Sequence, residues 1–307
     1  MRKGENFAND FRIARSLNHK MAFFIGAGAA RDESQGELQL PLGDDIKTYF
    51  LKMLNQDEES FKKKYGLKEV YPETVWAILM ENKPNQVKIT ALRSLLDRKD
   101  GKLIPVPSSY RFIAKLVLHN VVNAIVTTNF DEKIDEAFRD EIKRKFIRDT
   151  ILTIASDDND FSAYPFREEF TDQFRSEKIR VRAITLHKLH GTFSKPATII
   201  STAKPVSKPR REVLKNLINQ HDVIIFIGYS GRDLDIQQGL ESVLEELKGD
   251  LKKKEIWWAS LTEPDKQMID IIKSKFGTGN DKFTYYNVLA SEALKLIWRE
   301  VEWRKTS

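Results

Sequence analysis

The amino-acid sequence predicts an α/β fold, in which a Rossmann-like parallel sheet has helices on both faces and a smaller helical module is inserted into it. Short apolar runs of strand length recur along the 307 residues and alternate with stretches of helical periodicity. Several of these runs are apolar at consecutive positions, a pattern typical of strands that helices cover on both faces. Between the first two runs lies one long segment with helical spacing and no strand pattern.

The first predicted element is a helix over Phe7–Leu17, because Phe7, Phe11, Ala14 and Leu17 recur at helical spacing. The predicted strands are, in chain order, Met21–Ile25, Val121–Val126, Ile151–Ala155, Arg182–Leu186, Val223–Ile227, Glu255–Ala259 and Phe283–Val288. The helices predicted between and after them are Pro107–Leu118, Glu132–Phe146, Arg211–Asn219, Leu234–Leu247, Glu263–Lys275 and Ser291–Trp303. Because strands and helices alternate, we expect parallel strands with ligands at their carboxyl ends.

A helical insertion is predicted over Asp44–Lys99. Its apolar residues at helical spacing are Ile46, Tyr49, Phe50, Leu54, Val75, Ile78 and Leu79. We therefore assign residues 1–43 and 100–307 to the Rossmann-like nucleotide-binding domain and residues 44–99 to the inserted module. A second polar stretch, Ser156–Glu177, is rich in Asp, Phe and Arg and is predicted to form a mobile or lid-like excursion.

Composition excludes several classes of protein. Hydrophobic residues make up 41% of the chain, which suffices for a large buried core and rules out a disordered chain. There is no cysteine, so disulfides, iron–sulfur clusters and a cysteine-ligated zinc site are excluded. No apolar run approaches the roughly 20 residues of a membrane span, and Met1–Asn6 lacks the apolar region of a secretory signal. We therefore expect a cytoplasmic protein with no membrane partner.

The net charge is +6, from 51 Lys and Arg against 45 Asp and Glu spread along the chain. A basic surface could bind nucleic acid, but no cluster of basic and aromatic residues accompanies the charge. Nucleic-acid binding therefore stays open and is not the favoured prediction.

Two glycines follow the first predicted strand, in the run Gly26-Ala27-Gly28. Glycines at this spacing let the backbone turn tightly and approach a pyrophosphate. A helix N-terminus after them would offer amide groups and a partial positive charge. A full dinucleotide fingerprint has a third glycine where this chain has Arg31. A tight turn without a ligand is the alternative.

Polar residues also follow the second predicted strand, in the run Thr127-Thr128-Asn129-Phe130-Asp131. Thr128 or Asn129 could simply cap the helix that comes next. A cap needs only one such residue, however, and four polar side chains leave this strand. The density of the cluster therefore favours a ligand site.

A third strand ends in the run Leu186–Gly191, which contains His187 and His190. A neutral imidazole at a strand end could accept a proton near about pH 7, so the run supplies a candidate general base. Metal binding is not favoured, because no third ligand accompanies the two histidines.

A fourth strand is followed by Gly228-Tyr229-Ser230-Gly231-Arg232-Asp233. This run is similar to part of a nucleophile elbow, but Arg232 stands where the elbow has its last glycine. We favour a nucleotide loop, in which Gly228 allows close approach of the backbone and Ser230 supplies a hydroxyl. Asp233 would cap the next helix or orient the loop.

Taken in order, these four strand-end motifs resemble the SIR2 family, and in particular the SIR2-like NADases of bacterial antiphage defence. The resemblance spans roughly Met21–Asp233. It implies Asn129 and His190 as catalytic residues, with Asn129 holding the nicotinamide ribose or the attacking water and His190 as the general base. The residues that it implies for binding NAD are Gly26, Ala27, Gly28, Thr128, Asp131, Gly228, Ser230 and Asp233.

In this resemblance the first glycine loop lines the pyrophosphate, Asp131 shapes the nicotinamide side, and Gly228 and Ser230 contact the adenosine half. His187 matches no family residue and is interpreted as structural.

The chain also departs from the family. Without cysteine it cannot form the zinc ribbon of the protein-deacylating members, Ala30 replaces a usual serine, and Thr128 replaces a glutamine. These departures disfavour acyl-peptide chemistry and leave NAD cleavage possible.

The sequence therefore predicts a zinc-free NAD+ glycohydrolase that cleaves NAD+ to nicotinamide and ADP-ribose, as the toxic effector of an antiphage defence system. A zinc-free deacylase and a non-catalytic sensor of NAD or ADP-ribose remain alternatives. We expect a homo-oligomer, or a complex with a separate sensor or ATPase defence protein. An apolar stripe in the last helix is either core or a docking face, and consists of Leu294, Ile297, Trp298 and Val301.

Overall fold

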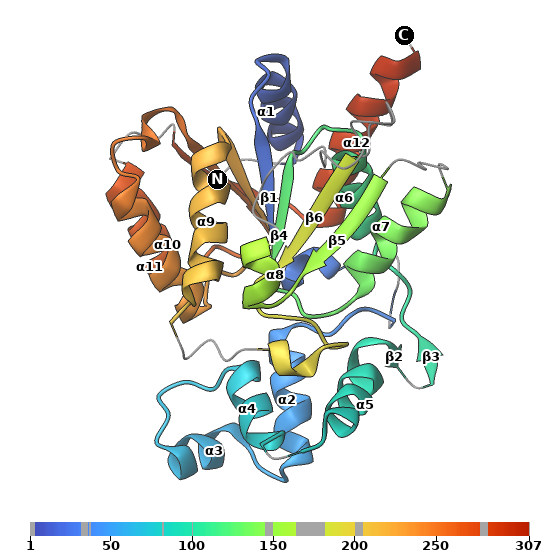
Figure 1. The fold of residues 1–307 in the computed structure, drawn as a ribbon, viewed down its shortest axis with the longest axis vertical. Coiled ribbons are helices and arrows are strands. Elements are labelled where there is room, and N and C mark those ends of the chain that lie inside the picture. Colours follow the sequence, from blue (N-terminus) through green and yellow to red (C-terminus); the bar gives the residue numbers. More distant parts are fainter. Residues whose placement is uncertain are drawn as a thin grey trace.

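The computed structural model describes residues 4–31, 36, 38–81, 83–99, 101–144, 150–163, 182–199, 205–276 and 282–306. Its centre is a seven-stranded sheet with the order β5-β6-β4-β1-β7-β8-β9 (Figure 1). The strands are β1 (Met21–Ile25), β4 (Ala124–Thr127), β5 (Thr150–Ala155), β6 (Arg182–Lys188), β7 (Val223–Ile227), β8 (Glu255–Ser260) and β9 (Phe283–Asn287). Each pair of neighbouring strands runs parallel, which confirms the predicted sheet.

Helices cover both faces of this sheet. Side chains alternate along a strand, so Phe23 and Ile25 of β1 enter one core while Ala22 and Phe24 enter the other. The helices that cover the sheet at the first core are α1 (Gly4–Ser16), α6 (Ser108–Leu118), α7 (Lys133–Arg144) and α12 (Ala290–Thr306), and apolar residues of the insertion join the same core. Those of the second are α8 (Asp158–Ala163), α9 (Lys208–Gln220), α10 (Leu234–Glu246) and α11 (Lys266–Phe276). Burial on two faces explains the consecutive apolar residues.

The direction in which the chain adds strands reverses at β1. From this central strand the chain first crosses to β4 on one side and later to β7 on the other. Ligands of open α/β sheets bind in the crevice outside the carboxyl ends of the strands at such a reversal. The loops that begin at Gly26 and Gly228 flank this crevice.

The predicted insertion is observed as four helices, α2 (Gly43–Met53), α3 (Glu58–Tyr65), α4 (Pro72–Leu79) and α5 (Asn85–Leu96). They lie beyond the carboxyl ends of the strands (Figure 1). Buried aromatic residues hold them together, and the rings of Phe50 and Trp76 are 5.2 Å apart. One detail was wrong: Lys99 is not helical but pairs in the short hairpin of β2 (Arg98–Lys99) and β3 (Lys102–Leu103). Gly101 turns this hairpin with a φ of +77°, which glycine adopts readily.

Other differences from the predicted elements are local. The strand predicted from Val121 begins only at Ala124, because the residues before it close the turn after α6, with Val121 N donating to Leu116 O. Leu17, assigned to the buried face of the first helix, lies beyond α1 and is exposed. The predicted excursion Ser156–Glu177 begins with α8, and its residues after 163 lie outside the described part.

The apolar stripe of the last helix belongs to the core. Its four residues, Leu294, Ile297, Trp298 and Val301, are at most 5% exposed. They face α6 and α1, with which α12 makes extensive contact. The stripe therefore offers no surface to a second copy, and the docking alternative for it was wrong.

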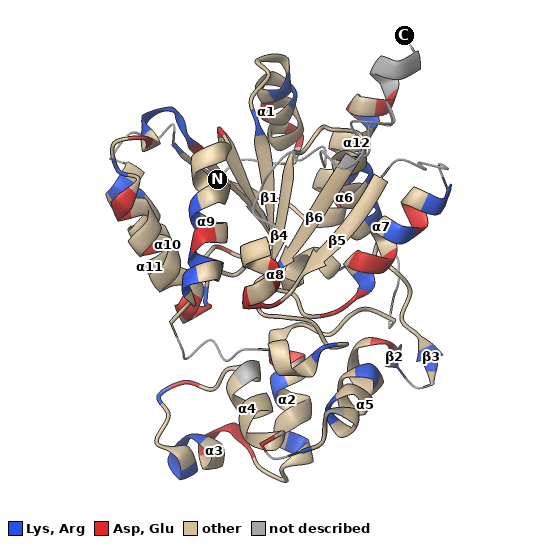
Figure 2. Cartoon of the chain, in the orientation of Figure 1, with Lys and Arg blue, Asp and Glu red and all other residues tan. Residues whose placement is uncertain are grey.

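Charged residues of both signs are interspersed on the outer helices in the view of Figure 2. Helices α7 and α9, for example, each carry Lys or Arg together with Asp or Glu. In the described part of the chain, no helix is long and apolar enough to cross a membrane.

Candidate active site

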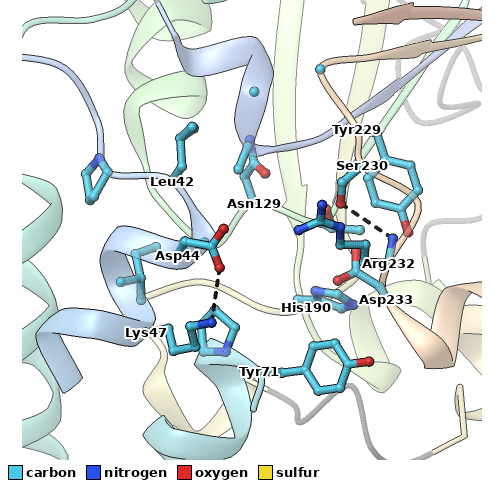
Figure 3. A pocket seen from close by; sticks show the side chains of 18 of the residues that line it. Leu42, Asp44, Lys47, Tyr71, Asn129, His190, Tyr229, Ser230, Arg232 and Asp233 are labelled. Carbon is cyan, nitrogen blue, oxygen red and sulfur yellow. Dashed lines mark hydrogen bonds and ion pairs between the residues drawn. The ribbon is translucent and has the colours of Figure 1, made fainter. Parts of the chain in front are cut away.

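A cavity of about 1240 Å³ lies between the carboxyl ends of the central strands and the helical insertion (Figure 3). Residues of the insertion, among them Asp44, Lys47 and Tyr71, line one side of it. The opposite side contains nine of the ten predicted site residues, namely Ala27, Gly28, Thr128, Asn129, Asp131, His190, Gly228, Ser230 and Asp233. The fold thus brings together motifs that are up to about 200 residues apart in sequence.

Gly26 is the predicted residue that does not line the cavity. Its backbone N donates to Ile227 O at 3.0 Å, and a Cβ atom on it would lie 2.5 Å from the Cα of Tyr229. Gly26 therefore allows the two strand-end loops to touch. Gly28 continues this contact, with its N 2.8 Å from Gly228 O.

The segment after the glycines differs from the expected helix. Ala27–Ala30 form a four-residue 3₁₀ turn, and the next helix, α2, begins only at Gly43. A turn this short does not provide the aligned peptide dipoles of a longer helix. The expected helix N-terminus is therefore absent from this described segment.

Asn129 is held by a chain of hydrogen bonds. Its backbone N donates to Thr127 Oγ1 at 3.0 Å, and its side-chain Nδ2 donates to the hydroxyl of Tyr110 at 2.8 Å. That hydroxyl donates in turn to Asp131 Oδ2 at 3.3 Å. Burial and the nearby Asp131 carboxylate raise the pKa of Tyr110 well above its usual range, so the phenol keeps its proton. These contacts fix the orientation of the Asn129 amide.

The polar residues after β4 do not cap α7 in the way first considered. Asp131 accepts from Lys133 N at 2.9 Å through Oδ1, so Asp131, and not Thr128 or Asn129, satisfies an amide at the helix start. The latter two side chains remain at the cavity.

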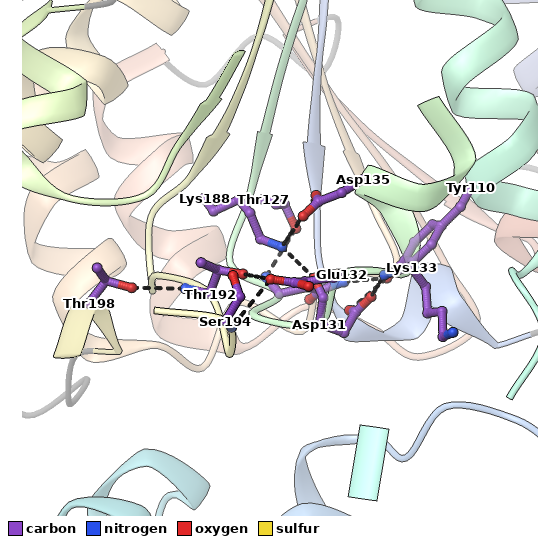
Figure 4. A network of polar contacts seen from close by, with 11 residues as sticks. Tyr110, Thr127, Asp131, Glu132, Lys133, Asp135, Lys188, Thr192, Ser194 and Thr198 are labelled. Carbon is purple, nitrogen blue, oxygen red and sulfur yellow. Dashed lines mark hydrogen bonds and ion pairs between the residues drawn. The ribbon is translucent and has the colours of Figure 1, made fainter. Parts of the chain in front are cut away.

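Lys188 joins the loop after β4 to the strand that leads to His190 (Figure 4). Its ammonium group is fully buried, donates to the backbone O of Asp131, and lies 3.3 Å from Asp135 Oδ2. Burial raises the pKa of Asp131 and of Asp135, and the positive charge of Lys188 opposes this rise. The single positive charge of the buried lysine therefore partly offsets the charge of the two carboxylates and connects β6 to the loop after β4.

We expect Lys188→Met to lower the free energy of unfolding by about 3–5 kcal/mol near neutral pH, because two buried carboxylates lose their partner. Their folded-state pKa values, already raised, would rise further above the unfolded value of about 3.9. Stability is then lost as pH rises through the folded-state values, so the deficit should shrink on acidification. Urea unfolding at about pH 7.5 and about pH 5 measures this.

The matched control is Lys195→Met. This ammonium also lies near two aspartates, Asp157 and Asp160, but its side chain is 53% exposed. We expect a change of at most about 1 kcal/mol, with little dependence on pH. Equal losses for the two variants would contradict the role given to burial.

His190 lies at the base of the cavity, beside the start of α10. Its Nε2 is 3.1 Å from Asp235 Oδ2, and both side chains are at most 1% exposed. Asp233 is nearby, and burial raises the pKa of its carboxyl while the neighbouring His190 opposes the rise. Asp233 occupies the N-cap position of α10 without a side-chain capping bond, so the capping interpretation for it was wrong.

His187 is buried elsewhere. Its ring is stacked on that of Phe161, with 6.3 Å between the ring centres, and it does not line the cavity.

Tyr71 extends from the insertion toward the same region (Figure 3). Its hydroxyl donates to Glu69 Oε2 at 2.5 Å, and burial raises the pKa of this phenol, as do Glu69, Asp233 and Asp265. The insertion therefore contributes a protonated phenol to the lining of the cavity.

Sequence reasoning missed Tyr110, Lys188, Asp235 and Tyr71. Lys188 lies inside the recognised run Leu186–Gly191 but was given no role there, and Asp235 lies two residues beyond the run that ends at Asp233. Their places along the chain were their only signals. Tyr110 lies in a predicted helix whose apolar spacing indicates core and not a site, and Tyr71 lies in a segment without any motif.

The fold and the cavity define a Rossmann-like α/β protein whose site lies at the strand ends beneath a helical module. The family model described as the SIR2-like domain matches residues 123–278, just over half of the chain. The chain therefore belongs to the SIR2-like family, as the motifs predicted.

Several solved structures are similar to this chain. One is a Sir2 homologue in complex with NAD, at 12% identity and a TM-score of 0.47, covering 96% of this chain and 94% of that one. Another is Sir2 bound to an acetylated peptide, at 10% identity and a TM-score of 0.44, covering 95% and 98%. A third, of a Sir2 enzyme, has 14% identity and a TM-score of 0.42, covering 99% and 100%. No curated protein matches the chain.

Proposed function

We propose that this protein is an NAD+ glycohydrolase, which cleaves the bond between nicotinamide and ribose and releases nicotinamide and ADP-ribose. The observation that carries the proposal is the convergence of Asn129, His190 and the paired glycine loops on one cavity. Membership of the SIR2-like family supports it. Within this proposal, residues 1–43 and 100–307 form the nucleotide-binding domain and residues 44–99 a separate module over the site.

In the proposed reaction, water forms a bond to C1′ of the ribose as the C1′–nitrogen bond breaks. The electron pair of that bond goes to the nicotinamide ring, whose positive charge is thereby neutralised, and the proton of water goes to His190. Because nicotinamide is already a good leaving group, the protein has to supply position and a base. The fixed amide of Asn129 would hold the ribose or the water. A general base typically contributes about 10²–10⁴-fold, and orientation supplies the remainder.

The remaining site residues would bind the rest of NAD. Ala27 and Gly28 would face the pyrophosphate with their backbone, Gly228 and Ser230 the adenosine half, and Asp131 the nicotinamide side. Thr128 and Asp233 complete the lining. Gly26 would act behind them, by allowing the contact between the two loops.

The direct test is mass analysis of NAD+ incubated with the purified protein. Release of nicotinamide and ADP-ribose in equal amounts, without added peptide, is expected. Release that requires an acyl-lysine peptide would establish the deacylase alternative. Tight binding of NAD+ or ADP-ribose with no product after hours would establish the sensor alternative.

We expect chelators to change neither folding nor NAD cleavage. Among the residues that the structure describes, no three His, Asp or Glu side chains form a group suited to hold a metal ion. Metal analysis, thermal unfolding and NAD cleavage, each with and without EDTA, measure this. A stoichiometric zinc ion, or activity that EDTA removes and zinc restores, would contradict it.

In the cell, we propose that the protein is a cytoplasmic effector of antiphage defence, whose activity is restrained until a trigger or partner acts. An unrestrained enzyme would consume the NAD+ of its own host. A homo-oligomer, or a complex with a sensor or ATPase protein, would supply the control. Cellular NAD+ should then fall only after phage infection, and growth should be normal before it. Depletion without infection would reject the restraint.

A further inference from the structure

The contact between His190 and Asp235 joins two segments that are 45 residues apart in sequence. Asp235 lies in the first turn of α10, two residues beyond the nucleotide loop, and does not itself line the cavity. Asp235 Oδ2 is 3.1 Å from His190 Nε2. His190, unlike Asp235, lines the cavity. Asp235 therefore touches the candidate base from behind.

The carboxylate of Asp235 determines how the His190 ring can take part in this hydrogen bond. A carboxylate oxygen accepts a hydrogen bond from Nε2 only when the ring hydrogen is on Nε2, which leaves the lone pair of the neutral ring on Nδ1. The two side chains are 1% and 0% exposed, so water does not compete for the contact. When the ring gains a proton, the adjacent negative charge stabilises the imidazolium that forms.

The charges around the pair come from three elements. Asp233 at the start of α10 adds a second negative charge near His190. Arg210 of α9 interacts electrostatically with Asp235 and forms an ion pair with Asp158 of α8 at 2.9 Å. Burial lowers the pKa of Arg210, and Asp158 and Asp235 oppose this. Arg210 thus supplies the positive charge that offsets the buried carboxylate of Asp235.

We infer that Asp235 is the positioning residue of the active site, which selects the Nε2–H tautomer of His190 and stabilises its protonated form during turnover. This inference rests on the proposed function in which His190 is the general base. Asp235 touches neither substrate nor reacting atoms, so its effect passes entirely through the imidazole.

The kinetic test compares Asp235→Asn with Glu141→Gln. Glu141 of α7 is also 1% exposed and also has one carboxylate oxygen without a hydrogen-bond partner among the described residues, but lies outside the cavity. Asp235→Asn should lower kcat by up to about 10⁴-fold with little change in KM, the loss known for replacing by its amide a carboxylate that orients a catalytic histidine. The acid limb of its pH profile should move to lower pH, because the imidazolium loses a stabilising charge. Glu141→Gln should leave kcat and the profile unchanged.

Asp235→Glu keeps the charge and should recover part of the lost kcat together with the parent pH profile. A kcat and an acid limb in Asp235→Asn that match those of the parent would overturn the inference. The same holds for an equal loss in Asp235→Asn and Glu141→Gln, since that would reflect stability alone.

A second measurement does not depend on NAD cleavage. Nitrogen NMR of protein with labelled histidine reports the tautomer of each ring, and His190 is assigned by comparison with His190→Gln. We expect the Nε2–H tautomer in the parent and its loss in Asp235→Asn. An Nδ1–H tautomer in the parent overturns the inference even if the variants do not fold. Absence of NAD cleavage together with the Nε2–H tautomer would reject the proposed function while supporting the contact.

Discussion

His190→Ala is expected to bind NAD+ and to hydrolyse it about 10²–10⁴-fold more slowly than the parent, because it lacks the group that accepts the proton of the attacking water. The imidazole lines the cavity, is 1% exposed and contacts Asp235. A base from the solvent therefore does not readily take its place. Initial rates of nicotinamide release, with NAD+ affinity from calorimetry, separate the loss of chemistry from a loss of binding.

The matched control is His187→Phe. His187 precedes His190 by three residues, is fully buried, and stacks on Phe161 away from the cavity. An aromatic ring of similar shape preserves that stacking, and NAD cleavage should persist. Cleavage by His190→Ala within a few-fold of the parent would show that the base is another group. His190→Gln, which keeps a hydrogen-bond donor for Asp235, tests whether any loss comes from unfolding.

Gly228→Ala is expected to abolish NAD binding and to lower the free energy of unfolding by about 2–5 kcal/mol. Gly228 has a φ of +59°, in the left-handed region that disfavours side chains. A Cβ atom there would lie 2.0 Å from Ala29 N and 2.4 Å from Gly28 C, both of which are backbone atoms. The two loops would have to separate, which removes the contact between Gly28 N and Gly228 O. Urea unfolding and calorimetry measure the two effects.

Gly66→Ala separates backbone strain from steric conflict. Gly66 ends α3 with a φ of +64°, close to that of Gly228, but no atom lies within 4 Å of the position of its Cβ. This variant should lose only about 1–2 kcal/mol, the cost of the left-handed conformation, and should bind NAD+ normally. If Gly228→Ala lost no more stability than Gly66→Ala and still bound NAD+, the close packing of the loops would not matter to the site.

Local patterns sufficed for most of the fold. The strands Met21–Ile25 and Val223–Ile227 were predicted with the observed bounds. Each is a run of five apolar residues between a charged residue and a glycine, which is the length and pattern of a buried strand. The strand predicted from Val121 was too long, because apolar residues that close a buried turn look the same as residues of a buried strand.

By itself, the sequence determined the parallel α/β sheet and the helical insertion, and nine of the ten site residues that it predicted do line the cavity, because strand-end motifs lie where the chain leaves a buried strand. Only the tertiary structure decided the contacts between those motifs. Lys188 of β6 contacts the backbone of Asp131 after the neighbouring strand β4, Tyr110 of α6 holds Asn129, and Asp235 of α10 contacts His190. Such contacts depend on which strands become neighbours and which loops touch. That arrangement is set by packing over the whole sheet, and local spacing along the chain does not record it.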